Sequence, residues 1–184
     1  MSRPVKPDPV KLMAAFLYRE TTDMSKALGE MEARFDGADA VSDEMVFDFT
    51  EYYCREMGKP LYRRFVCFRE LLDPGNLAEI KLWTNDLEHA MESDSLRRVN
   101  VDPGVLCAGS LVLATCKPAP HRPYLGSGVF ADLTLMYSEG EYRPLEWTYP
   151  DYRDERVRAF MGQARELLLF ELRSIKRGEW RGPC

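Results

Sequence analysis

The sequence predicts an α+β domain in which about three helices pack on one face of a mostly antiparallel sheet. Three observations carry this prediction. Runs of β-forming residues dominate the second half of the chain, apolar residues recur three times at helical spacing, and a turn signal (SEGE, 138–141) joins two strands. A chain of 184 residues is typical of one domain. We expect that domain to span 1–184, with an extended arm over 1–9 and a frayed end over 178–184.

The first half of the chain predicts strands that alternate with helices. Residues 10–18 (VKLMAAFLY) are apolar throughout, as in a buried strand. Thr22 or Asp23 is the expected N-cap of the first helix, and Asp73 followed by proline is a good start for the second. The other elements expected in this half are strands over 44–49 and 62–68 and a helical turn before Gly58.

The second half predicts a meander of strands and a long terminal helix. Strands are expected over 110–116 and 129–137, and the turn after them should form a hairpin with a strand over 142–147. Pro144 should place that last strand at an edge of the sheet, because proline lacks an N–H for the ladder. The sequence DPG at 102–104 is expected to form a turn.

Composition and motifs exclude several classes of function. The net charge of −5 disfavours extended contacts with nucleic acid, and no apolar run is long enough to cross a membrane. Five cysteines without C-x-x-C spacing predict reduced thiols and a cytoplasmic protein. No P-loop or dinucleotide fingerprint occurs, so the cofactor is unknown. With two histidines in the chain, a multi-histidine metal site is disfavoured, and no residue is assigned to a metal.

The segment 116–128 (CKPAPHRPYLGSG) and the strand after it hold the main candidate site. His121 and Asp132 are candidates for general acid and base work, because the unperturbed pKa of histidine lies near neutrality. Lys117 and Arg122 suit a phosphate or carboxylate, and Thr134 shares a strand face with Asp132. The alternative is that Asp132 and Arg122 form a structural ion pair. The glycines are more simply explained as strand punctuation than as a phosphate cradle.

Two further segments supply candidate ligand-binding residues. Asn100 and Asp102 are polar side chains at an expected strand end, although the same residue types also stabilise turns. The segment WTYPDYR contributes Trp147, Asp151 and Arg153, in which aromatic rings can stack on a ligand. The alternative is that this segment covers the core at the start of the last helix.

Several of these segments together resemble a known bacterial family. They include FDFTEYYCREMG, LAEIKLWTNDLE, RRVNVDPGVL, LVLATCKPAPHRPYLGSGVFADLTLMY and WTYPDYR, in this order from Lys11 to Leu169. The chain is similar to domain of unknown function family 4416, whose members are single domains of similar length. Some members are labelled GTP-binding, but this chain has no P-loop to support that label. The family carries an aromatic residue at the position of Val105 and lacks the cysteine at Cys116, which argues against a role for that thiol.

Two functions of different classes follow from these observations. The first is binding of a small anionic or phosphorylated ligand, nucleotide-like in character, with acid–base chemistry at the same site. The second is a non-enzymatic module that binds a partner or a second copy through aromatic surface residues around Tyr52 and Trp147. Whether the chain forms a homo-oligomer is left open.

Overall fold

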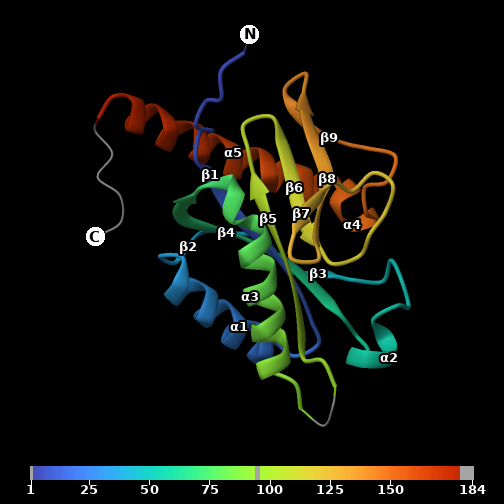
Figure 1. Cartoon of the computed structure of the whole chain (residues 1–184). Helices are drawn as coiled ribbons and strands as arrows, with labels where there is room; N and C mark the ends of the chain where they lie inside the picture. Colours follow the sequence, from blue (N-terminus) through green and yellow to red (C-terminus); the bar gives the residue numbers. More distant parts are fainter. Residues whose placement is uncertain (1, 94–95, 179–184) are drawn as a thin grey trace.

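The computed structural model describes residues 2–93 and 96–178 (Figure 1). Residues 2–9 form no helix or strand, and most of the expected frayed end over 178–184 lies outside the described residues. The helices are α1 (Thr21–Arg34), α2 (Cys54–Met57), the 3₁₀ turn η1 (Pro74–Asn76), α3 (Leu77–Ala90), α4 (Pro150–Arg153) and α5 (Glu155–Lys176). The strands are β1 (Val10–Tyr18), β2 (Ala38–Val41), β3 (Met45–Val46), β4 (Tyr62–Leu72), β5 (Val99–Leu106), β6 (Ser110–Thr115), β7 (Tyr124–Gly126), β8 (Val129–Ser138) and β9 (Glu141–Pro144).

All nine strands join one antiparallel sheet, which confirms the predicted α+β class. The strand order is β2-β4-β1-β5-β6-β8-β7, with β3 paired to β4 and β9 paired to β8. The hairpin between β8 and β9 is present, with Ser138 opposite Glu141. β9 ends at Pro144 and pairs with β8 alone, as a proline-terminated edge strand should.

The prediction that the helices share one face of the sheet is wrong. The alternating side chains of β1 separate into two cores, because successive residues of a strand point to opposite faces. Met13 and Ala15 pack with α5, whereas Leu12 and Ala14 pack with α1 and α3. Figure 1 shows α3 in front of the strands and α5 behind them. All nine residues of β1 are buried, which is typical of a strand covered on both faces.

The expected turn at 102–104 is instead the middle of a strand. Asp102, Pro103 and Gly104 lie within β5 and pair with β1. Pro103 is tolerated because β6 pairs with β5 only from Gly104 onward, so no bond to β6 is lost. Gly104 is required by close approach: a Cβ here would lie 2.7 Å from Leu113 Cδ2 and 2.9 Å from the Val112 carbonyl oxygen.

Three other local predictions concern the starts of two helices and the length of one strand. The N-cap of α1 is Glu20 rather than Thr22 or Asp23, whereas Asp73 accepts a hydrogen bond from the Gly75 N–H as expected. The strand expected over 44–49 is reduced to β3. No helix among the described residues is both long and apolar enough to span a membrane.

Candidate functional site

A cleft of about 520 Å³ opens where β6 separates from β5. One wall is the first half of β5, with Asn100 and Asp102, and the opposite wall is the end of β6 and the start of the 116–128 segment. The remaining walls come from α3, from the segment 47–53 before α2, and from residues 149–152. The divergence of two neighbouring strands thus creates the cavity, and most of its polar residues lie on rigid elements.

Two side chains of α3 form hydrogen bonds with backbone groups of β5 that a neighbouring strand would otherwise bind. The Glu88 carboxylate accepts a hydrogen bond from the Val101 N–H at 2.8 Å, and the Lys81 ammonium donates to the Val101 carbonyl at 3.2 Å. Both side chains are buried and line the cleft. They satisfy the exposed strand edge, which would otherwise be a costly pair of unpartnered groups. Burial raises the pKa of Glu88 to about 7, against the opposing effect of Lys81.

Asp102 is the centre of the polar network on the β5 wall. It accepts hydrogen bonds from Asn100 Nδ2 at 2.7 Å and from Arg63 Nη1 at 3.3 Å, and Lys81 Nζ lies 3.8 Å away. Arg97 Nη1 donates to Asn100 Oδ1 at 2.9 Å, which extends the network along the strand. Two hydrogen bonds and one nearby ammonium group hold this carboxylate in a fixed orientation.

Arg63 and Asp151 line the cleft and form a buried ion pair in which some polar atoms make no hydrogen bond. Arg63 Nε lies 3.0 Å from Asp151 Oδ2, and both side chains are 5% exposed or less. Despite this ion pair, both of these atoms and the nearby Tyr152 hydroxyl make no hydrogen bond with any described residue. Burial raises the pKa of Asp151, although the Arg63 guanidinium opposes the shift. Unpartnered buried polar groups cluster at ligand sites more often than elsewhere.

Aromatic side chains form another part of the cleft lining. Tyr52 and Tyr53 contact each other edge to face with ring centroids 4.9 Å apart, and Phe47 packs against Tyr53 and over Arg63. Tyr52 and Tyr149 each expose a large part of their surface, 56% and 41%. Burial raises the pKa of Tyr53, and its hydroxyl makes no hydrogen bond with any described residue. Rings of this kind suit stacking on a planar ligand.

Lys117 differs from the other cations of the cleft. Arg63, Lys81 and Arg97 each have a carboxylate within 4.0 Å. The Lys117 ammonium has none among the described residues and instead lies 4.1 Å from the centroid of the Tyr52 ring. It is therefore the cation at this site that is free to pair with an anion from solution.

A second polar cluster is centred on the Arg122–Asp132 ion pair, next to the residues that line the cleft. Arg122 donates to Asp132 Oδ2 at 2.8 Å, to the Tyr149 hydroxyl at 2.6 Å and to the Lys117 carbonyl at 2.8 Å. His121 Nε2 lies 4.0 Å from the same Asp132 oxygen, beyond hydrogen-bonding distance. The His121 ring stacks on Trp147 with centroids 4.8 Å apart. This cluster fixes the 116–128 segment against the segment before α4.

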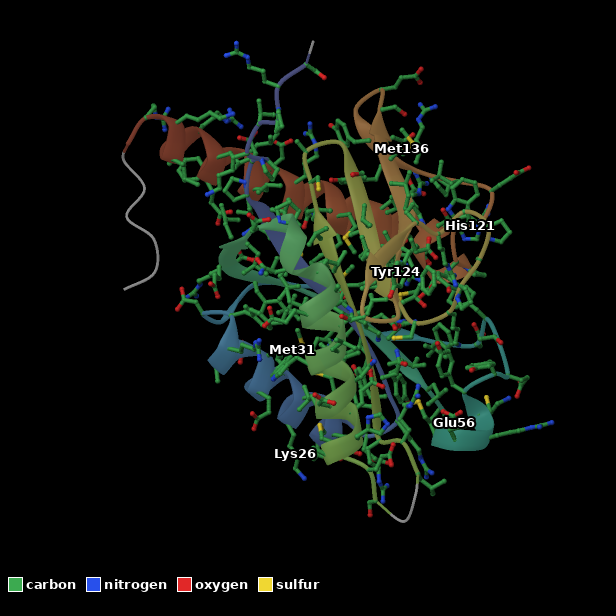
Figure 2. All side chains as sticks on the ribbon, in the orientation of Figure 1. Lys26, Met31, Glu56, His121, Tyr124 and Met136 are labelled. Carbon is green, nitrogen blue, oxygen red and sulfur yellow. The ribbon has the colours of Figure 1, made fainter. Side chains whose placement is uncertain are left out.

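The predicted site residues therefore fall into two groups. Those that line the cleft are Lys117, Asn100, Asp102, Asp132 and Asp151. His121, Arg122, Thr134, Trp147 and Arg153 do not line it. Thr134 is fully buried and donates to the Asp132 carbonyl, while Arg153 donates to three carbonyls of the 145–148 segment. Figure 2 shows His121 on the side of the view away from Lys26 and Met31 of α1.

Several residues of the cleft were not among the predicted site residues, including Arg63, Lys81, Glu88 and Tyr53. Arg63 lies beside Arg64 at the start of β4, and Lys81 and Glu88 lie seven residues apart on one helix. The charge of Arg63 within that strand, and the shared helix face of Lys81 and Glu88, were available as signals. Tyr53 carried no signal that separates it from its neighbour Tyr52.

Comparison with known proteins gives one match. A family model described as Domain of unknown function (DUF4416) matches residues 8–168, which include every residue of the cleft. No curated protein and no solved structure matches the chain. The match covers nearly the whole chain, and the chain therefore belongs to the DUF4416 family.

Proposed function

We propose that the cleft binds a small ligand that combines a planar ring with an anionic group, as in a nucleotide or another phosphorylated metabolite. The ring would stack among Tyr52, Tyr53 and Tyr149, and the anion would pair with Lys117. The volume of about 520 Å³ suits a ligand of this size.

The unpaired charge of Lys117 is the observation that carries the proposal. Arg63, Lys81 and Arg97 are matched by Asp102, Asp151 and Glu88, so these groups largely neutralise one another. Lys117 adds one positive charge at the aromatic wall without a counter-ion among the described residues. A ligand anion placed there gains a charge-assisted hydrogen bond without breaking an existing ion pair.

The proposal concerns binding and assigns no proton-transfer step. The Asp132 carboxylate is already held by two nitrogens of Arg122, and His121 does not line the cleft.

The four described cysteines are unpaired, which supports the cytoplasmic location expected from the sequence.

A thermal-shift screen with nucleoside monophosphates and sugar phosphates tests the proposal. We expect at least one nucleoside monophosphate to raise the midpoint of unfolding, and Lys117→Gln to remove most of that increase. Lys26→Gln is the matched control, because Lys26 is an exposed lysine on α1, outside the cleft. If no compound stabilises the wild-type chain, or if Lys117→Gln responds as fully as the control, the proposal is wrong.

The same screen separates the partner-binding alternative. A module that uses the exposed rings of Tyr52 and Trp147 to bind protein would show no response to small anions. A dimer formed through those rings would dissociate in Tyr52→Ser, which sedimentation velocity measures directly.

A further inference from the structure

A second cavity of about 320 Å³ adjoins the cleft. It lies between the start of α1, the short helix α2 and residues 96–98, which precede β5. Four arginines and three acidic residues line it, so its described lining carries a net positive charge.

Arg97 lies between the two cavities, because it lines both of them. Among the described residues its side chain makes one hydrogen bond, from Nη1 to Asn100 Oδ1 at 2.9 Å. Its Nε lies 3.6 Å from Glu56 and 3.7 Å from Glu88, which are longer ion-pair contacts. The side chain is 32% exposed, so a change of rotamer requires no repacking of the core.

Arg98 lines the second cavity and supplies a positive charge that no carboxylate of the described residues offsets. Its side chain makes no hydrogen bond or ion pair with any residue that the structure describes. Arg19, by contrast, lies 3.3 Å from Glu20, and Arg97 faces two glutamates. Arg55 also lacks a hydrogen bond or ion pair with a described residue, but its side chain is exposed, whereas that of Arg98 is half-buried. The second cavity thus resembles the surroundings of Lys117, where some cations are paired with carboxylates and a further cation is not.

We propose that the second cavity is an anion-binding subsite, with Arg98 as its principal cation and Arg97 as a movable wall. It follows that the ligand is elongated and carries two anionic groups, one at Lys117 and one at Arg98. The position of the first group rests on the proposed function. The subsite itself depends only on Arg98 and its surroundings. A phosphate or a carboxylate fits equally, because a guanidinium pairs with both in the same bidentate geometry.

Inorganic phosphate tests the subsite without any assumption about the cleft. The whole chain, labelled with ¹⁵N, is titrated with phosphate at constant ionic strength. We expect saturable amide shifts in residues 19–23, 54–58 and 97–99, and about tenfold weaker binding in Arg98→Gln, the loss expected for one charge-assisted hydrogen bond. Arg3→Gln, in the exposed N-terminal arm, is the control and should bind as the wild type does. Shifts that do not saturate, or that persist unchanged in Arg98→Gln, would overturn the subsite.

Two nucleotides then test the link between the cavities. We expect ATP to bind at least tenfold more tightly than AMP, and Arg98→Gln to weaken ATP while leaving AMP unchanged. Equal binding of ATP and AMP by the wild type, with the phosphate result positive, would show a separate anion site and refute the elongated ligand. Failure of every nucleoside monophosphate and sugar phosphate of the screen to bind, with the phosphate result positive, refutes the proposed function and leaves the subsite standing.

Discussion

The carboxylate of Glu88 takes the place of a missing strand: its Oε1 atom accepts the Val101 N–H at 2.8 Å, on the side of β5 from which β6 has separated. Lys81 completes the substitution at the Val101 carbonyl. The cleft is open because these two side chains of α3 satisfy the strand edge in place of a neighbouring backbone.

The buried position of Glu88 makes stability depend on pH. Its folded-state pKa is raised to about 7, so between pH 4.5 and 7 the folded chain holds this proton more tightly than the unfolded chain does. The contribution of Glu88 to the free energy of unfolding therefore falls as pH rises through that window, by about 3 kcal/mol in all. Glu88→Gln keeps the acceptor for Val101 and removes the titration. Urea unfolding at a series of pH values should show the variant gaining on the wild type as pH rises, and parallel curves would contradict this account.

Gly104→Ala should destabilise the fold by about 1–3 kcal/mol, because the added methyl group overlaps the β6 backbone at the Val112 carbonyl. Gly162→Ala is the matched control. It lies within α5, where a Cβ would meet no atom of another element within 4 Å, and it should raise stability by up to about 1 kcal/mol. Denaturant unfolding of both variants checks the pair. A Gly104→Ala variant as stable as the wild type would mean that β6 does not approach so closely.

The Arg63–Asp151 pair should couple strongly in a double-mutant cycle. Removing Arg63 alone, as Arg63→Met, leaves Asp151 buried without a counter-ion and should cost about 3–5 kcal/mol. Arg63→Met combined with Asp151→Asn should cost less than the sum of the two single changes, because neither charge is then left alone. Additive free energies of unfolding would show that the two groups do not interact.

Arg122→Gln should loosen the 116–128 segment. The change removes the counter-ion of Asp132, which is 2% exposed, and we expect a loss of about 3 kcal/mol together with faster hydrogen exchange over residues 117–128. Arg143→Gln provides the comparison, since its pair with Glu139 is on the surface and should contribute less than about 1 kcal/mol. Similar exchange rates in the two variants would show that Arg122 does not fasten the segment.

The amino-acid sequence by itself determined the fold class and several of the elements. Apolar runs and helical spacing located β1, β6, β8 and α5, because local periodicity follows directly from which side chains must be buried. The resemblance to the family was also readable from the sequence alone. Residue type alone made Lys117, Asn100 and Asp102 candidates, and all three line the cleft.

Only the tertiary structure decided how those residues come together. Helices cover both faces of the sheet, β5 continues through Pro103, and β6 separates from β5. All three features depend on contacts between distant segments, which a local pattern does not encode. The same is true of Arg63 and Glu88, whose burial beside partners from other elements gives the cleft its charge. His121 shows the converse. Its residue type suggested chemistry, but packing places it against Trp147, outside the cleft lining.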